Sequence, residues 1–404
     1  MKDAFIIDAV RTPFGNFGGT LSTIRTDDLG AIPLREIVKR NPSIPLDAYE
    51  DVIMGCANQA GEDNRNVARM CALLAGLPWS VPGETLNRLC SSGMSAIVHA
   101  NRAIKANDGD VFLAGGVENM TRGPFVISKV SKAFGRDAQM HDSSFGWRFV
   151  NPKMKALYGV DGMGHTAENL AELYNINRKD QDQFAYWSQS KAAAAQVSGR
   201  LAEEIIGVEI PRRKQDPVLF DKDEFIRANT TTEILAKLRP AFKPLDKGGT
   251  VTAGNASGLN DGAAAMIVAS EAAVKKYNLK PLARIVSSAV VGVEPRIMGI
   301  GPVGASQKAL AKAGLKLSDI GIIELNEAFS AQALACTRKL GLSDDDARIN
   351  PNGGAIAIGH PLGVSGTRIV HTAALELHKT NRQYALATMC VGVGQGYAMI
   401  IERV

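Results

Sequence analysis

One cysteine stands where a protein chain can make a thiol reactive. Cys90 lies in LCSSG, directly before a helical pattern that begins near Met94. The free N–H groups and the partial positive charge at a helix N-terminus lower the pKa of a thiol and stabilise the thiolate. Cys90 is therefore a candidate nucleophile, although burial as a small core residue explains its position equally well.

A histidine occupies a similar turn later in the chain. His360 lies in GGAIAIGHPLGVSG, and Pro361 after it suits the first turn of a helix. Because Cys90 and His360 both stand in turns that enter helices, a pseudo-twofold axis between two halves would bring their side chains together. Without that relation, an ordinary packed histidine is the better interpretation of His360.

Two strand ends carry further candidates. Cys390 follows the apolar run Ala385 to Met389, and α/β proteins place their sites at the carboxyl ends of strands. The glycines from Gly392 to Gly396 end eight residues before the C-terminus, which leaves no room for the helix of a phosphate-binding turn. They predict a turn that places backbone N–H groups near Cys390. Core packing of Cys390 and helix capping by Asn326, in ELNEAF, are the alternatives.

An α/β framework must position these residues, because short apolar runs alternate with helical patterns along the chain. The predicted strands are Ala4 to Val10, Val52 to Gly55, Val111 to Ala114, Ile267 to Ala269, Ala283 to Val291, Ile322 to Leu325 and Ala385 to Met389. The predicted helices are Asp27 to Val38, Met94 to Ala106, Thr166 to Tyr174, Asp180 to Gln196, Ala305 to Lys312, Ala328 to Leu340 and Thr367 to His378.

The turns of Cys90 and His360 belong to two stretches with the same layout. In each, a Gly- or Ser-rich turn enters a helix, and a strand ending in glycines follows. Such self-similarity predicts two duplicated halves. Lys/Arg-rich loops with few strand patterns indicate an insertion at residues 121–250. We expect an N-terminal half from residues 1–120 and 251–280, and a C-terminal half from residues 281–404.

The composition excludes several classes of protein. The chain has 404 residues, of which 45% are hydrophobic and 22% charged, as in a soluble globular protein. Its net charge of +5 is too small and too evenly spread for a nucleic-acid partner. No apolar run approaches a membrane span, and no signal peptide is expected. Five cysteines without C-x-x-C spacing argue against disulfides and structural zinc, so we expect a cytoplasmic protein.

Four motifs, in their order and spacing, resemble the thiolase family. They are LNRLCSSG around Cys90, NEAF at 326–329, GGAIAIGHP at 353–361 and CVGVGQG at 390–396, and the resemblance covers essentially the whole chain. It implies two βαβαβαββ halves in a five-layered αβαβα arrangement with an inserted loop domain. It also implies a homodimer or homotetramer that takes CoA and acyl-CoA thioesters as substrates, without a tightly bound cofactor.

The resemblance assigns roles to five residues. His360 would take the proton of Cys90, whose thiolate attacks the 3-oxo carbon of the substrate in covalent catalysis. His360 and a water held by Asn326 would stabilise the enolate of acetyl-CoA, which Cys390 would protonate. The backbone N–H groups of Cys90 and Gly392 would hold the oxyanion of the second transfer. The expected CoA pocket comprises Met163, Arg227, Phe242, Ser257, Ala328 and Phe329, with Arg227 against adenine and Ser257 on the pantetheine.

Two stretches look like the β-ketoadipyl-CoA thiolases within the family. They are GCANQAGEDNRNVAR at 55–69 and GWRFVNPKMKALYGVDGM at 146–163. That subgroup cleaves 3-oxoadipyl-CoA with CoA into succinyl-CoA and acetyl-CoA, in the degradation of aromatic compounds. Gly162 stands where acetoacetyl-CoA thiolases carry a histidine, which favours the longer substrate. A thiolase for acetoacetyl-CoA, or for 3-oxoacyl-CoA esters in general, is the alternative.

A 3-oxoadipyl chain ends in a carboxylate, whose burial requires a cation or several donors. Arg148, in GWRFVNPKMK, is the candidate, because a guanidinium binds a carboxylate through two parallel hydrogen bonds. Trp147 and Phe149 would hold its backbone in apolar surroundings. A solvated loop arginine is an equally good interpretation.

Two other functions are weighed against a thiolase. A decarboxylating ketoacyl synthase would need a second catalytic histidine at the position of Cys390. A non-catalytic acyl-CoA carrier on the same scaffold would be expected to lack Cys90, His360 or Cys390, and all three are present.

Overall fold

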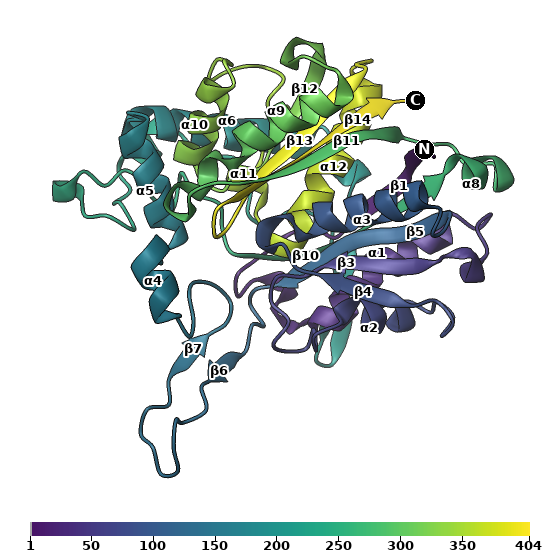
Figure 1. The fold of residues 1–404 in the computed structure, drawn as a ribbon, viewed down its shortest axis with the longest axis horizontal. Coiled ribbons are helices and arrows are strands. Elements are labelled where there is room, and N and C mark those ends of the chain that lie inside the picture. The colour runs from purple at the N-terminus through teal and green to yellow at the C-terminus, as the bar shows by residue number, and fades with distance from the viewer. Residues whose placement is uncertain (1) are drawn as a thin grey trace.

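The computed structural model describes residues 2–404, which form one extended mixed sheet with helices on both sides (Figure 1). The strands of this sheet are β1 (Ala4–Arg11), β2 (Gly15–Asn16), β3 (Asp51–Gly55), β4 (Gly83–Leu86), β5 (Val111–Asn119), β10 (Asn260–Ser270), β11 (Ala283–Gly292), β12 (Ile320–Leu325), β13 (Tyr384–Val391) and β14 (Gln395–Arg403). Their order is β12-β13-β14-β11-β1-β10-β5-β3-β4, and the short β2 pairs with β10. The predicted α/β class is confirmed.

The two halves of this sheet repeat one pairing scheme. In the N-terminal half, β3 runs parallel to β5, β5 antiparallel to β10, and β10 antiparallel to β1. In the C-terminal half, β12 runs parallel to β13, β13 antiparallel to β14, and β14 antiparallel to β11. The halves meet where β1 pairs with β11, through Phe5 with Arg284 and Ile6 with Ala283. This repeat is the duplication predicted from the two similar turns.

Helices form three layers around the two half-sheets. The helices are α1 (Thr26–Arg40), α2 (Val67–Leu74), α3 (Ser92–Ala106), α4 (Pro152–Tyr158), α5 (Met163–Leu173), α6 (Arg178–Val197), α7 (Thr232–Ala236), α8 (Glu271–Lys276), α9 (Gly301–Ala313), α10 (Ser330–Lys339), α11 (Ala355–Ile358) and α12 (Leu362–Lys379). In the middle, α3 and α12 share one apolar core with strands of both halves. The outer faces are covered by α1 and α2 in the N-terminal half and by α9 and α10 in the C-terminal half. The result is the five-layered αβαβα order.

Because both faces of the N-terminal half-sheet are covered, its two central strands, β5 and β10, are buried throughout. All nine residues of β5 and all eleven of β10 are buried. Alternate side chains of β5 enter different cores, Phe112 and Ala114 the central one and Val111 and Leu113 the outer one. These two strands are longer than predicted, because their Gly, Asn and Asp residues have low strand propensity in isolation.

The chain between β5 and β10 carries helices and two hairpins. The hairpins are β6 (Phe125–Ile127) with β7 (Met140–Asp142) and β8 (Val208–Arg212) with β9 (Gln215–Phe220). The β6–β7 hairpin projects away from the two halves (Figure 1). Neither hairpin is among the predicted strands, because their residues are mostly exposed and no core enforces an apolar alternation.

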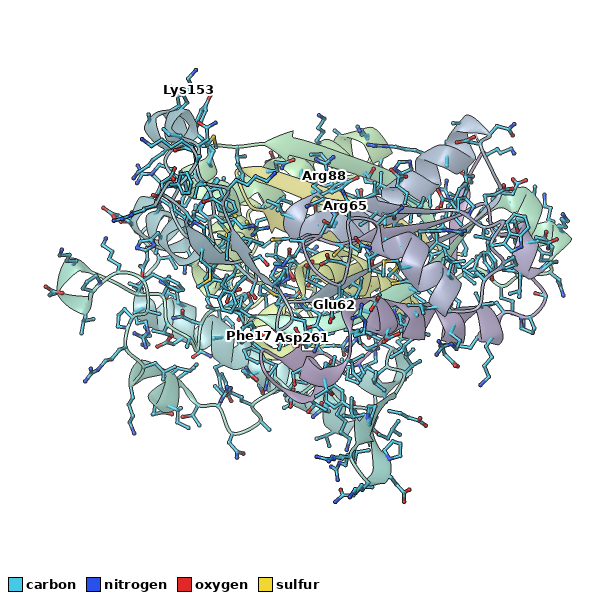
Figure 2. The ribbon with its side chains drawn as sticks, turned by 90° about the horizontal axis from the view of Figure 1, so that it is seen from below. Phe17, Glu62, Arg65, Arg88, Lys153 and Asp261 are labelled. Carbon is cyan, nitrogen blue, oxygen red and sulfur yellow. The ribbon has the colours of Figure 1, made fainter. Side chains whose placement is uncertain are left out.

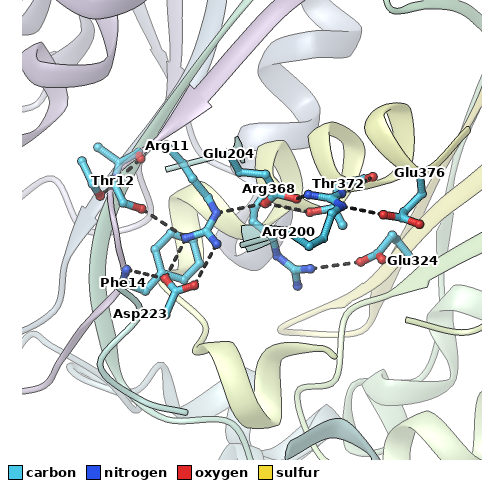
Figure 3. Close-up of polar contacts among 11 residues, drawn as sticks. Arg11, Thr12, Phe14, Arg200, Glu204, Asp223, Glu324, Arg368, Thr372 and Glu376 are labelled. Atoms are coloured by element: carbon cyan, nitrogen blue, oxygen red, sulfur yellow. Dashed lines mark hydrogen bonds and ion pairs between the residues drawn. The ribbon is translucent and has the colours of Figure 1, made fainter. Parts of the chain in front are cut away.

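A buried ion network ties this inserted chain to β1 and to α12 (Figure 3). The Arg11 guanidinium donates to both carboxylate oxygens of Asp223, at 2.7 and 2.8 Å, and to Glu204 at 3.1 Å. Arg200 then bridges Glu204, at 2.8 Å, and Glu376 of α12, at 2.6 Å. Removing one partner of a buried pair costs about 3–5 kcal/mol, so this network holds the inserted chain against both halves.

Glycines allow the central helices to approach each other. A Cβ atom on Gly366 of α12 would collide with the backbone of Met94 in α3. A Cβ atom on Gly93 of α3 would collide with the carbonyl oxygen of Gly363 in α12, and so would one on Gly116 of β5. The first turns of α3 and α12 are therefore in backbone contact, at the level of the turns of Cys90 and His360.

Gly366→Ala is expected to lower the free energy of unfolding by about 1–3 kcal/mol, because its Cβ meets backbone that cannot yield as a flexible side chain does. Gly304→Ala in α9 is the control, since its Cβ would lie an ordinary 3.5 Å from the side chain of Val291. Alanine is also the better helix former there, by about 1 kcal/mol. Urea unfolding measures both variants, and a Gly366→Ala variant as stable as the wild type would contradict the close approach.

Candidate active site

Cys90 lies in a tight turn, the 3-10 segment Leu89–Ser91, between β4 and α3. Leu89 has a φ of +45°, in the left-handed region that branched side chains rarely adopt. Ser92 holds the turn: its hydroxyl donates to the carbonyl of Leu89 at 2.7 Å and accepts the N–H of Arg88 at 2.8 Å. The turn leaves Cys90 buried, with 8% of the residue exposed.

Cys390 lies near the end of β13, just before the hairpin turn to β14. The pairing of Val391 with Gln395 closes this turn, so the turn predicted for these glycines is present. It brings the N–H of Gly392 to the sulfur of Cys90. Arg88 joins the two turns from the other side, donating to Gln395 Oε1 at 2.9 Å.

Both thiols are buried and therefore protonated at neutral pH. Burial raises the pKa of Cys90 to about 11, although the backbone N–H groups of Gly392 and of Cys90 itself lower it. Burial also raises the pKa of Cys390 well above its usual value, and the neighbouring Cys90 raises it further. The prediction that the helix N-terminus lowers the pKa of Cys90 is thus wrong, because desolvation outweighs the N–H donors.

Three contacts hold His360 in one orientation. Its backbone N–H donates to Asn260 Oδ1 at 2.9 Å, its Nδ1 lies 2.6 Å from Ser365 Oγ, and its Nε2 lies 3.5 Å from Asn326 Nδ2. The Ser365 hydroxyl donates to the carbonyl of Pro361 at 3.0 Å, so its oxygen accepts a hydrogen bond from the Nδ1–H group of His360. Nε2 then carries the lone pair of the neutral ring, as a general base requires.

Burial lowers the pKa of His360 to about 3, and the positive charge of Arg368 in α12 lowers it further. The imidazole is therefore neutral at physiological pH. The turn of Cys90 packs against α12, the helix that begins just after His360. Beside the imidazole, Asn326 Oδ1 is buried without a hydrogen-bond partner among residues 2–404. An unpartnered amide oxygen of this kind marks a place for a donor, such as a water or a ligand.

Comparison with known proteins places this geometry in a family. The chain matches the family described as "Thiolase, N-terminal domain" over residues 4–272 and "Thiolase, C-terminal domain" over residues 279–403. It belongs to the thiolase family.

Two bacterial thiolases are similar to this chain over its full length. It is 59% identical to the beta-ketoadipyl-CoA thiolase of Acinetobacter baylyi and 57% identical to the 3-oxoadipyl-CoA/3-oxo-5,6-dehydrosuberyl-CoA thiolase of Escherichia coli, with 100% of each chain covered. Among solved structures, the Bacillus anthracis acetyl-CoA acetyltransferase superposes with a TM-score of 0.92 at 40% identity, covering 100% of this chain and 99% of that one. The predicted thiolase fold is confirmed.

Four of the residues expected at the CoA pocket of this thiolase contact one another or pair through the backbone. The rings of Phe242 and Phe329 lie edge to face, with centroids 6.2 Å apart. The N–H of Ser257 donates to the carbonyl of Ala328 at 3.0 Å. These contacts join the inserted chain to the NEAF segment that carries Asn326.

The other two expected residues are linked to this cluster through their neighbours. A Cβ atom on Gly164, after Met163, would meet the Phe242 ring, and one on Gly258, after Ser257, would meet the Phe225 ring near Arg227. Met163 begins α5, and its sulfur faces Gly392, at 4.0 Å from where a Cβ of that glycine would stand. Arg227 is exposed, with its guanidinium carbon 5.8 Å from the centroid of the Phe225 ring. Met163 therefore approaches the thiols, whereas Arg227 faces solvent.

Arg148 is half-buried and donates to the carbonyl of Ser143 at 3.2 Å. Trp147 is anchored, since its indole N–H donates to the carbonyl of Asp161 at 3.2 Å. Phe149 is 45% exposed and has a φ of +49°, so it does not supply the apolar surroundings that the sequence predicts.

Two residues that orient His360 are absent from the sequence-based candidates. Ser365 stands five residues after His360 in the first turns of a helix, and that spacing is a local signal for a contact. Asn260 lies 100 residues from His360, so no local pattern connects them. None of the helices in residues 2–404 is long and apolar enough to cross a membrane, and no group of three or more His, Cys, Asp or Glu side chains in that range can hold a metal ion.

The rate of Cys90 alkylation by iodoacetamide is expected to rise about tenfold per pH unit between about pH 6 and pH 9.5, without a plateau. The reacting species is the thiolate, and the pKa of about 11 keeps its fraction small over this range. Mass spectrometry of the Cys390→Ser variant assigns the adduct to Cys90. A plateau that begins near neutral pH would show a low thiol pKa and contradict the effect of burial.

Proposed function

We propose that this chain is a 3-oxoadipyl-CoA thiolase, which cleaves its substrate with CoA into succinyl-CoA and acetyl-CoA through an acyl-enzyme on Cys90. The observation that carries the reaction type is the pair of neighbouring buried thiols, one of which accepts the N–H of Gly392. The full-length identity to the two bacterial thiolases supports the substrate. Aromatic degradation is the process that such a substrate implies.

In the first transfer, the sulfur of Cys90 attacks the C3 carbonyl of 3-oxoadipyl-CoA while Nε2 of His360 takes the thiol proton. The backbone N–H groups of Cys90 and Gly392, which hold the oxyanion of the second transfer, donate hydrogen bonds to this first tetrahedral oxyanion as well. The C2–C3 bond then breaks, which leaves the succinyl group on Cys90 and releases the enolate of acetyl-CoA. Cys390 donates its proton to C2 and completes acetyl-CoA.

The enolate oxygen needs donors at the moment it carries charge. Nε2 of His360 is protonated at this stage and supplies one. A water that donates to the enolate can also donate to the buried, unpartnered Oδ1 of Asn326. Such donors are worth more in a site without bulk water than in solution, and their orientation is set before the reaction begins.

In the second transfer, the Cys390 thiolate takes the proton of the CoA thiol, whose sulfur attacks the succinyl thioester. Cys90 leaves as a thiolate and recovers its proton from His360, so both thiols and the imidazole return to their neutral forms. The raised thiol pKa values and the lowered imidazole pKa favour this neutral resting state.

Further parts of the proposal concern binding and assembly. We assign the pantetheine and adenine of CoA to the cluster around Met163, Ser257 and Phe329, with Arg227 as its solvent-exposed edge. The protein is proposed to need no tightly bound cofactor, to act in the cytoplasm, and to assemble as a homodimer or homotetramer.

An acetoacetyl-CoA thiolase is the second candidate, because the Bacillus anthracis structure at 40% identity bears the name acetyl-CoA acetyltransferase. Gly162 separates the two candidates less sharply than the sequence suggests, since Nδ1 of His165 lies 3.6 Å from where a Cβ on Gly162 would stand. The His165 imidazole therefore lies close to the space that a histidine side chain at position 162 would enter. The ratio of kcat/KM for 3-oxoadipyl-CoA to that for acetoacetyl-CoA decides between them, and a ratio below one would favour the second candidate.

Cys390→Ser is expected to retain acylation of Cys90 by an acyl-CoA but to slow thiolytic cleavage by about 10²-fold or more, because general acid–base catalysis contributes about 10²–10⁴-fold. A serine hydroxyl has too high a pKa to replace a thiol. Peptide mapping of quenched enzyme should find the acyl group on Cys90. An acyl group on Cys390 in the wild type would reverse the assigned roles.

Arg148→Ala is expected to raise KM for 3-oxoadipyl-CoA and to leave acetoacetyl-CoA cleavage nearly unchanged, since only the longer substrate carries a carboxylate. Lys153→Ala is the matched control, because Lys153 lies in the same stretch but points outward from α4 (Figure 2). Steady-state kinetics on both substrates measure the effect. Equal changes for both substrates, or no change for either, would remove Arg148 from the acyl pocket.

A further inference from the structure

Glu118 is a buried carboxylate that has no role in the proposed reaction. It lies near the end of β5, and 2% of the residue is exposed. Its oxygens accept three backbone N–H groups, from Ala57 at 2.8 Å, Asn58 at 2.9 Å and Gly363 at 2.8 Å. Those N–H groups, rather than a cation, stabilise its negative charge. Burying a charge in this way is costly, so the three contacts are the reason to look for a role.

The contact with Gly363 leads to His360, the proposed base. Gly363 lies in the first turn of α12, directly after His360 and Pro361. Pro361 is the N-cap residue of α12, and no side chain of its own caps the helix. Glu118 therefore supplies, from the other half of the molecule, the acceptor and the negative charge that a helix N-terminus favours.

The contact with Ala57 leads to Cys90, the proposed nucleophile. The carbonyl of Ala57, whose N–H is held by Glu118, accepts a hydrogen bond from Asn87 Nδ2 at 3.0 Å. Asn87 Oδ1 in turn accepts the N–H of Leu89 at 2.9 Å. Leu89 is the left-handed residue that immediately precedes Cys90. A continuous path of hydrogen bonds and backbone thus joins Glu118 to the strained turn of the nucleophile.

The contact with Asn58 leads to the inserted chain. Asn58 Nδ2 donates to the hydroxyl of Ser143 at 3.0 Å and to its carbonyl at 3.2 Å. That carbonyl also accepts the guanidinium of Arg148. The segment proposed to meet the acyl chain is therefore anchored to the same carboxylate.

We infer that Glu118 is a positioning residue, whose carboxylate sets the turn of Cys90 and the turn of His360 relative to each other. The inference rests on the proposed function, which makes these two side chains partners in proton transfer. No hydrogen bond joins Glu118 to the side chain of Cys90 or of His360 within residues 2–404, although burial and, after it, the negative charge of Glu118 raise the pKa of Cys90. A displacement of about 1 Å between reacting groups can reduce a rate by about 10²-fold, so the three contacts affect turnover rather than CoA binding.

Glu118→Gln tests this role, because glutamine keeps the size of the side chain but places an amide NH₂ against backbone N–H donors. We expect kcat to fall by about 10- to 100-fold and single-turnover acylation of Cys90 to slow by the same factor. KM for CoA should stay within about twofold, since the hydrogen bonds of Glu118 within residues 2–404 go to Ala57, Asn58 and Gly363 and not to the CoA cluster. The assay is run near pH 8.5, because burial raises the pKa of Glu118 to about 7.

Glu168→Gln is the matched control. Glu168 is also a buried carboxylate, 4% exposed, that accepts backbone N–H groups, from Thr250 at 2.9 Å and Val251 at 2.8 Å. The kcat of the Glu168→Gln variant should stay within about twofold of the wild type, even if its melting temperature falls by as much as that of the Glu118→Gln variant. Equal losses of kcat in the two variants, or wild-type kcat in Glu118→Gln, would overturn the inference.

Asn87→Asp keeps the test decisive if Glu118→Gln does not fold. Asn87 is exposed, and aspartate removes the donor to Ala57, retains an acceptor for Leu89 and adds a negative charge that solvent screens. A fall in kcat with an unchanged melting temperature supports the path from Glu118 to Cys90, and an unchanged kcat contradicts it. Cys90→Ala tests the proposed function separately, because an active Cys90→Ala variant would refute the acyl-enzyme whatever the Glu118 variants do.

Discussion

The backbone contact between α3 and α12 is the constraint on which the rest of the structure depends. Each helix begins just after a turn that carries a reactive side chain, Cys90 in one half and His360 in the other. Only glycine at Gly93 and Gly366 lets the first turns of the helices meet, because a Cβ atom at either position would collide with the other helix. Without this approach the thiol and the imidazole would sit on separate half-sheets, because the direct pairing between the halves is limited to β1 and β11.

That close packing also sets the electrostatics of the site. A thiol and an imidazole enclosed between two half-sheets lose the water that would stabilise their charged forms, so the pKa of Cys90 rises and that of His360 falls. The pair is neutral at rest, unlike a preformed thiolate and imidazolium. In the proposed reaction, charge develops only as the substrate reacts, and the N–H groups of Gly392 and Cys90 are already in place to donate hydrogen bonds to it.

Buried charges elsewhere connect elements that the sheet does not join. The network from Arg11 through Glu204 and Arg200 to Glu376 holds the inserted chain to β1 and α12 (Figure 3). Glu118 differs because its carboxylate accepts three backbone N–H groups and forms no ion pair within residues 2–404. In both arrangements the loss of any partner leaves a buried charge unpaired and costs folding free energy. The elements are therefore held in one relative position.

The residue pattern alone was enough to predict the α/β architecture and to name the candidate side chains for the reaction. Gly- or Ser-rich turns before helices indicated Cys90 and His360, and the end of a strand indicated Cys390. The repeated turn–helix–strand layout indicated two α/β halves, since turn chemistry and apolar periodicity are local properties. Only the folded chain shows that the pKa of Cys90 is raised, because the segments that bury this thiol lie up to hundreds of residues away in the sequence. It also decided the partners of His360 and Glu118, which come from Asn260 and Gly363 across the chain. Contacts at such separations leave no pattern in a local window, so only the folded chain reveals them.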